Sequence, residues 1–169
     1  MQRTGGQILV DALRVHGVDT VFCVPGESYL AVLDALHDAA DAISVITCRH
    51  ENGAAFMGEA YGKLTGKPGV TMVTRGPGAC NGSIGVHTAF QDSSPMVMFV
   101  GQVPRNFRGR EAFQEVDYEA MFAPLAKWAV EVNGGRLSVE DPGGEGSSFR
   151  ITLPRRPAAA TFVPSQRAG

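Results

Sequence analysis

The sequence predicts an α/β fold in which a mostly parallel sheet carries helices on both faces. Short apolar runs alternate along the chain with longer segments whose apolar residues recur at helical spacing. The runs are apolar throughout, which is typical of strands covered on both faces. The expected strands are 20–24, 43–47, 69–74 and 96–101, and the expected helices between them are 29–40, 51–66 and 80–93.

A further helix opens the chain. Thr4 and Gln7 have the spacing of a capping box, and apolar residues then follow at helical intervals until Gly17. The alternation weakens after Gly101, although 127–132 (KWAVEV) is predicted to be another strand. We expect one domain over 1–132, an appended β-hairpin over 133–154 built from RLSVE and SFRITLP, and a disordered Pro/Ala/Arg tail over 155–169.

Composition excludes several classes of protein. The 169 residues carry a net charge of -2 and no run of Lys or Arg, so nothing indicates binding to nucleic acid or to an anionic membrane. No signal peptide and no apolar run of about 18 residues is present, and we expect a cytoplasmic protein. Cys23, Cys48 and Cys80 lack the spacing of a disulfide framework or zinc site and are expected to be buried thiols.

Four loops follow the expected strands, and in a parallel sheet they open on one edge, where ligands bind. They cover 24–28, 47–53, 74–82 and 100–106. The third, TRGPGACNG, is a glycine-rich turn whose N–H groups suit an anion or a flat polar ring, although a simple tight turn explains it as well. His16 and His37 are expected on helices as surface or satisfied core residues, and His50 and His87 have no matching ligands for a metal site. Phe56, Met57, Met96, Met98 and Phe99 are expected to pack in the core.

Glu51 stands at the start of an otherwise small and apolar helix. An acid at this place is favoured by the helix dipole alone. The apolar residues that follow it would remove water from the carboxyl and raise its pKa, and a carboxyl that exchanges a proton near neutral pH can act as an acid/base group. The spacing alone does not decide between a dipole-compensating acid and an acid/base group.

Several motifs in order resemble the N-terminal pyrimidine-binding domain of thiamine-diphosphate enzymes, most closely the acetolactate synthase large-subunit type. They are VFCVPGES, RHENGAAFMGEAYGKLTGKPGV, TRGPGACNG, HTAFQDSSPM and REAFQEVD, within about residues 4–132. The resemblance implies that Glu51 hydrogen-bonds N1′ of the cofactor's aminopyrimidine, which lets the cofactor's own amino group take the proton from the thiazolium carbon. It also implies that Val24, Pro25, Gly26, Pro77 and Asn81 line the pyrimidine slot and that Phe90 and Gln91 face the substrate.

The same resemblance implies partners and missing parts. The small residues after Glu51 suit a helix that packs on its counterpart in a second subunit, so a homo-oligomer, or pairing with a relative that bears a diphosphate domain, is expected. The substrate would be a small 2-oxo acid, with pyruvate as the default. Motifs for the diphosphate's Mg2+ and the domain for FAD are not found, so the chain would hold only the pyrimidine half of the site and is expected to be inactive alone.

The last segment resembles a different family. NGGRLSVEDPGGEGSSFRITLP is similar to the final hairpin of the ATP-binding domain of histidine kinases, without that domain's other nucleotide motifs. An exchanged 3′ end that gives a truncated chimera is favoured over a small protein with a borrowed hairpin. A non-catalytic oligomerisation or regulatory module that pairs with a full-length relative is the alternative function, and a kinase-related nucleotide-binding fragment is disfavoured.

Overall fold

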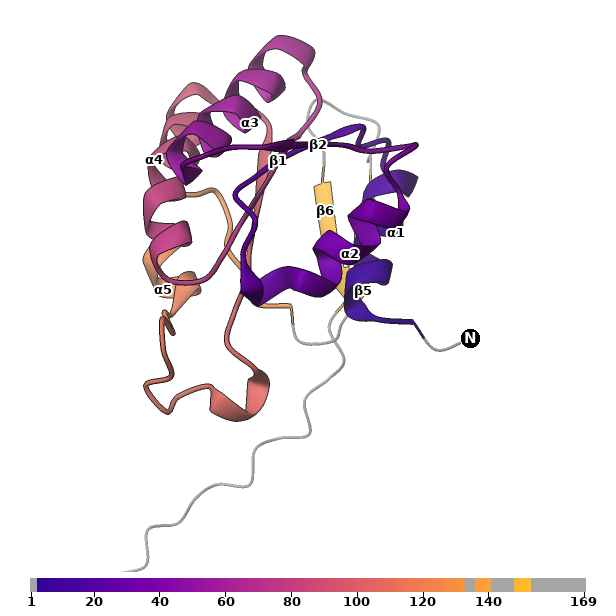
Figure 1. The fold of residues 1–169 in the computed structure, drawn as a ribbon. Coiled ribbons are helices and arrows are strands. Elements are labelled where there is room, and N and C mark those ends of the chain that lie inside the picture. Colours follow the sequence, from indigo (N-terminus) through magenta and orange to yellow (C-terminus); the bar gives the residue numbers. More distant parts are fainter. Residues whose placement is uncertain (1–2, 133–135, 141–147, 153–169) are drawn as a thin grey trace, which may run out of the picture. The chain divides into compact units, whose positions relative to one another are not determined.

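The structure is a computed structural model that describes residues 3–132, 136–140 and 148–152. The chain divides into two units, Met1–Glu131 and Val132–Gly169, which are described separately. The first unit is built on a four-stranded parallel sheet with the order β2-β1-β3-β4 (Figure 1). The strands are β1 (Thr20–Cys23), β2 (Ser44–Thr47), β3 (Gly69–Val73) and β4 (Met96–Val100). The predicted α/β class and parallel sheet are confirmed.

Two pairs of helices cover the sheet. In Figure 1, α1 (Gly5–Val15) and α2 (Leu30–Asp38) lie together on one side, and α3 (Glu51–Thr65) and α4 (Pro77–Asp92) lie together on the other. The capping box predicted for the first helix is present, because Thr4 and Gln7 exchange side-chain and backbone hydrogen bonds. The remaining helical elements are the 3-10 turns η1 (Glu27–Tyr29) and η2 (Arg105–Phe107) and the short α5 (Tyr118–Phe122).

The central strand β3 shows how one strand serves both faces. Val70 and Met72 belong to the aliphatic core under α1 and α2. Thr71 points to the other side, where its hydroxyl donates to the carbonyl of Ala54 in α3 at 3.3 Å. All five residues of β3 are buried, whereas all four of the outer strand β2 are exposed. The expectation that every strand is covered on both faces is therefore correct for β3 and wrong for β2, which pairs only with β1.

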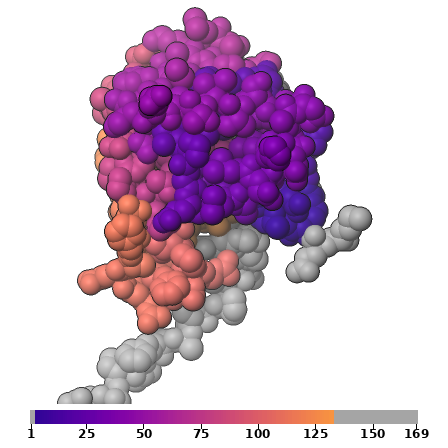
Figure 2. All heavy atoms as spheres, in the orientation of Figure 1, coloured from indigo at the N-terminus to yellow at the C-terminus, as the bar shows by residue number. Residues whose placement is uncertain are grey.

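The segment after β4 departs from the sequence-based expectation. Residues 127–132 form no strand, because the backbone N–H of Glu131 donates to the Glu119 carboxylate at 2.8 Å and its side chain pairs with Arg108. In the space-filling view this part of the chain, drawn from salmon to orange, makes a lobe beside the indigo and purple body (Figure 2).

The second unit contains an antiparallel hairpin of β5 (Arg136–Glu140) and β6 (Ser148–Thr152), with Leu137 opposite Ile151. These are the two strands predicted from RLSVE and SFRITLP. The predicted turn between them and the predicted tail over 155–169 lie outside the described residues.

Several side chains predicted to be buried are not. Phe56 and Met57 are exposed, because α3 turns its small residues toward the sheet. Met96, Met98 and Phe99 are half-buried on the outer strand β4, where Phe99 packs against the core as expected. Cys23 is buried as expected, but Cys48 is half-buried and Cys80 is exposed in the first turn of α4. None of the helices in the described part of the chain is long and apolar enough to cross a membrane.

Candidate functional site

The loops at the carboxyl ends of the strands meet around Ser28. Its hydroxyl lies 2.7 Å from the Thr74 hydroxyl and accepts the backbone N–H of Arg75 at 3.1 Å. A Cβ added to Gly101, which follows β4, would lie 1.9 Å from the same Ser28 oxygen. The backbone N–H of Cys48 donates to Cys23 O at 2.7 Å, which joins the ends of β2 and β1. The predicted gathering of these loops at one edge is confirmed.

Glu51 is the first residue of α3 and is half-buried at this edge. His50 caps the helix by accepting the backbone N–H of Asn52 at 3.3 Å. The position of Glu51 suits the positive end of the helix dipole, as expected. In addition, the Asn81 side-chain amide in α4 donates to Glu51 Oε2 at 3.0 Å. Because α3 and α4 both hold this carboxylate, it has a defined orientation that a dipole-compensating acid does not need.

Glycines in α4 allow Glu51 to lie close to that helix. A Cβ on Gly78 would lie 3.4 Å from Glu51 Oε1, and one on Gly85 would lie only 2.5 Å from the Cβ of Ala55. Side chains at these positions would push the helices apart. The small residues of α3 and α4 are thus needed for contacts within the chain.

The glycine-rich loop over 74–82 is a tight turn that is partly satisfied by the chain itself. Gly76 has a φ of +61°, and its backbone N–H donates to the Tyr118 hydroxyl at 2.6 Å. Burial is the main cause that raises the pKa of Tyr118 above its ordinary value, so its hydroxyl stays protonated. The N–H of Gly76 is therefore already bonded, which favours the tight-turn interpretation at this residue.

Val24, Pro25 and Gly26 lie beside the ends of β1 and β3. The Tyr29 hydroxyl donates to the Val24 carbonyl, and a Cβ on Gly26 would lie 2.4 Å from the Thr74 Cβ. Burial is the main cause that raises the pKa of Tyr29, and the neighbouring Cys23 and the negative charge of Glu51 raise it further. Tyr29 is a neutral hydrogen-bond donor near Glu51, and sequence reasoning missed it because it reads as an ordinary helical aromatic residue.

The structure brings together only part of the predicted site. Glu51 and Asn81 are in contact, and Pro77 opens α4 at the same edge. Phe90 and Gln91 instead lie in the last turn of α4, roughly 14 Å along the axis from Asn81 at a rise of 1.5 Å per residue. Within this chain they do not lie with Glu51.

A second Phe-Gln pair lies at the edge of the sheet that carries Glu51. Arg75 Nε donates to the Phe113 carbonyl at 3.3 Å, and a Cβ on Gly76 would lie 2.6 Å from the Cβ of Gln114. Gln114 has a φ of +63°, in the left-handed region. Sequence reasoning quoted REAFQEVD without assigning its Phe-Gln pair. The signal was available, because the dipeptide occurs twice and only the second copy lies outside a regular helical pattern.

The residues at this edge fit the pyrimidine half of thiamine diphosphate. Among the described residues, Asn81 is the only hydrogen-bond donor to Glu51, so Oε1 is available to a nitrogen of a bound ring. The bare Cα of Gly78 beside Oε1 leaves space that a side chain would fill. In the described part of the chain, no group of three His, Cys, Asp or Glu side chains is placed to hold a metal ion.

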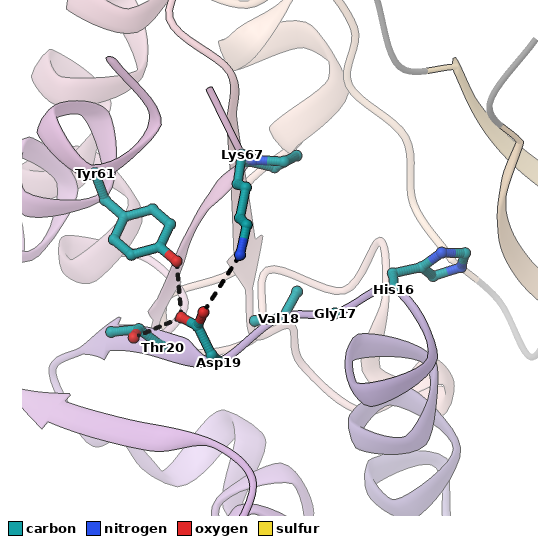
Figure 3. A pocket seen from close by; sticks show the side chains of 8 residues that line it. His16, Gly17, Val18, Asp19, Thr20, Tyr61 and Lys67 are labelled. Carbon is teal, nitrogen blue, oxygen red and sulfur yellow. Dashed lines mark hydrogen bonds and ion pairs between the residues drawn. The ribbon is translucent and has the colours of Figure 1, made fainter. Parts of the chain in front are cut away.

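A polar cluster at the opposite edge of the sheet surrounds Asp19 (Figure 3). Its carboxylate accepts from the Tyr61 hydroxyl at 2.7 Å and the Thr20 hydroxyl at 2.9 Å, and Lys67 lies 3.7 Å away. A pocket of 210 Å³ borders this cluster. Because two hydroxyls of the chain already donate to Asp19 Oδ1 and Lys67 pairs with Oδ2, this pocket is a weaker candidate than the edge that carries Glu51.

Comparison with known proteins gives the family of the chain. Residues 3–121 match the family described as thiamine pyrophosphate enzyme, N-terminal TPP binding domain. The mitochondrial acetolactate synthase catalytic subunit of Saccharomyces cerevisiae is 43% identical over 155 residues, which are 91% of this chain and 22% of that protein. Acetolactate synthase of Bacillus subtilis is 41% identical over 163 residues (96% and 28%), and catabolic acetolactate synthase of Raoultella terrigena is 37% identical over 177 residues (97% and 31%).

The chain spans less than a third of the length of each of these relatives. The family match runs from α1 into α5 and includes Glu51 and the loops around it. The chain therefore belongs to the thiamine pyrophosphate enzymes, as an N-terminal TPP-binding domain of the acetolactate-synthase-like kind.

Proposed function

We propose that this chain supplies the pyrimidine-binding half of an enzyme that converts small 2-oxo acids, with Glu51 as the acid that handles the proton of the bound ring. The observation that carries the proposal is the anchoring of Glu51 by Asn81, with Oε1 turned toward the space beside Gly78. Bound thiamine diphosphate would supply the carbon that attacks the substrate's carbonyl. A single acid suffices on the protein side, because the second proton-transfer group belongs to the cofactor.

The residues of the chain have separate tasks in this proposal. Glu51 holds a proton at a ring nitrogen, and Asn81 fixes the rotamer of Glu51. Val24, Pro25, Gly26 and Pro77 form the walls that orient the ring. The diphosphate, its Mg2+ and the FAD of the full-length family are assigned to other domains, so turnover by this chain alone is not expected.

The substrate-facing role has two candidate pairs. Phe113 and Gln114 lie beside Gly76, at the edge that holds Glu51. Phe90 and Gln91 could reach such a site only from another subunit, because they lie at the far end of α4. We assign the role to Phe113 and Gln114.

A homo-oligomer, or a complex with a relative that bears a diphosphate domain, completes the proposed site. The support is the surface of α3 and α4, on which Phe56, Met57, Leu64 and Ile84 are exposed. Exposed apolar side chains gathered on neighbouring helices are typical of protein interfaces. The same surface supports the second candidate function, a non-catalytic module that pairs with a full-length relative.

Reconstitution tests the proposal. The chain is mixed with thiamine diphosphate and Mg2+, alone and with a separately expressed diphosphate domain of a relative, and pyruvate consumption is followed. We expect activity only in the mixture, and a loss of about 10²-fold or more for Glu51→Gln, because removal of an acid/base group costs that much. Asp34→Asn, on the exposed face of α2, is the control and should leave the rate unchanged.

Each outcome separates the alternatives. Activity of the chain alone would contradict the half-site proposal. Complex formation without turnover in the mixture would favour the non-catalytic module. In the active mixture, Phe113→Ala should lower the rate more than Phe90→Ala, and the reverse result would return the substrate-facing role to Phe90 and Gln91.

A further inference from the structure

Arg75 follows β3 directly, and its guanidinium points into the junction of three loops. Its side chain is only 13% exposed, although it sits at the rim of the candidate site. The terminal nitrogen Nη2 forms an ion pair with Glu27, and Nε donates to the Phe113 carbonyl at 3.3 Å. One side chain thus joins the loop over 24–28, the glycine-rich loop and the segment that carries the Phe-Gln pair.

The backbone beside Arg75 strengthens the same junction. Its N–H donates to Ser28 at 3.1 Å, next to the Glu27 that pairs with the guanidinium. The next residue, Gly76, lies against the side chain and the carbonyl of Gln114. The contacts of Arg75 therefore set where the Phe113–Gln114 segment lies relative to the loops that flank Glu51.

Arginine has the chemistry that this junction requires. Its planar guanidinium offers five donors in fixed directions, so it can serve a carboxylate on one side and a carbonyl on another. A lysine has one nitrogen at the end of a flexible chain and would favour Glu27 alone. Since Glu27 is 68% exposed, the ion pair by itself contributes little stability, and the contact with Phe113 is the specific one.

We infer that Arg75 is a positioning residue that holds Phe113 and Gln114 at the mouth of the Glu51 site. Its catalytic consequence rests on the proposed function, whereas its structural consequence does not. Loss of the guanidinium would remove the side-chain link between the segment over 112–116 and the glycine-rich loop. The contacts of Gly76 with Gln114 and Tyr118, and the bond from the Gln102 amide to the Val116 carbonyl at 3.1 Å, would remain but do not bind Phe113. The sheet should be undisturbed, because Arg75 belongs to no strand or helix.

A second arginine defines the competing explanation. Arg108 lies 3.2 Å from the Glu115 carboxylate and also pairs with Glu131. Glu115 accepts the N–H groups of Gly109 and Ala112 at 2.6 and 3.2 Å. This cluster shapes the turn over 109–115 internally, but none of its bonds attaches the turn to the glycine-rich loop. If Arg108 alone decided where the Phe-Gln pair lies, Arg75 would be dispensable.

Hydrogen exchange on the full chain distinguishes positioning by Arg75 from positioning by Arg108 alone. We expect Arg75→Met to raise exchange in peptides over 112–116 by about tenfold while exchange in β3 stays unchanged. Arg75→Lys should show the same raised exchange, because lysine keeps the positive charge but lacks the planar guanidinium that reaches two acceptors. Glu27→Gln should change the exchange rate over 112–116 by less than threefold. Arg14→Met, on the exposed side of α1, is the matched control. Unchanged exchange over 112–116, or an equal rise in β3, would overturn the inference.

Kinetics of the reconstituted mixture give the second readout. Arg75→Met should lower kcat by about ten- to a hundredfold through misplacement of the Phe-Gln pair, with less than a twofold change in the half-saturating concentration of thiamine diphosphate. Equal loss of cofactor binding and kcat would contradict positioning. If the wild-type mixture is inactive, the proposed function fails, and the exchange experiment still decides the role of Arg75.

Discussion

The two helical layers of this domain differ in what they contribute. The layer of α1 and α2 is fixed by aliphatic side chains that fill the space against Val21, Val70 and Met72. The layer of α3 and α4 is fixed by the near absence of side chains where the helices touch, and it carries Glu51, Asn81 and an exposed apolar surface. The comparison indicates that one face of the sheet mainly provides stability and the other mainly provides the site.

The largest expected effect is in the first layer. Leu36→Ala in α2 removes a side chain that is 1% exposed in the core and should lower the free energy of unfolding by about 2 to 5 kcal/mol. Urea denaturation measures the change. Leu30→Ala, at the start of the same helix and 62% exposed, should change stability by less than about 0.5 kcal/mol. Equal losses for both variants would contradict the assignment of the core to this layer.

An intermediate effect is expected in the second layer. Gly85→Ala places a Cβ 2.5 Å from the Cβ of Ala55 and should destabilise by about 1 to 3 kcal/mol, because two packed helices must separate. It should also lengthen the Glu51–Asn81 hydrogen bond, which NMR of the Asn81 amide would detect. Gly53→Ala in α3 meets no atom within 4 Å and should be neutral or stabilising by up to about 1 kcal/mol. If Gly85→Ala destabilises the protein and Gly53→Ala does not, the close approach of α3 and α4 is what requires glycine at position 85.

The smallest effect concerns Asp19, which links β1 to the end of α3 and the turn after it. The hydrogen bond from Tyr61, then that from Thr20 and the charge of Lys67, hold the pKa of Asp19 below its ordinary value of 3.8. Because the folded pKa is the lower one, the stabilisation is present above about pH 4 and is lost as the pH falls through the folded pKa.

The size of this effect is limited by solvent. Asp19 is 52% exposed, so the contribution should stay under about 1 kcal/mol. Urea midpoints of the wild type and Asp19→Asn between pH 5 and pH 2 measure it, with Asp34→Asn as control. The difference in urea midpoint between wild type and Asp19→Asn should shrink toward pH 2. A difference that does not change with pH would mean that the carboxylate charge does not cause the stabilisation.

The hydropathy pattern of the sequence predicted the elements of the first unit well. A strand buried on both faces, such as β3, needs a continuous apolar run, and a helix that packs one face on the sheet, such as α1, needs apolar residues at helical spacing. The pattern failed over 127–132, where an apolar run becomes a strand only if a neighbouring strand accepts it, and Glu131 binds Arg108 and Glu119 instead. It also placed Phe56 and Met57 in the core, because hydropathy does not tell which face of α3 meets the sheet.

The sequence by itself determined the α/β class, the start of α3 at Glu51 and the family of the chain, because these depend on residue order over short distances. Only the tertiary structure decided that Asn81, thirty residues away, holds Glu51, and that Phe113 and Gln114 rather than Phe90 and Gln91 lie at that edge. Both depend on how α4 and the segment after β4 cross the sheet edge, and contacts between distant segments are set by packing rather than by local pattern.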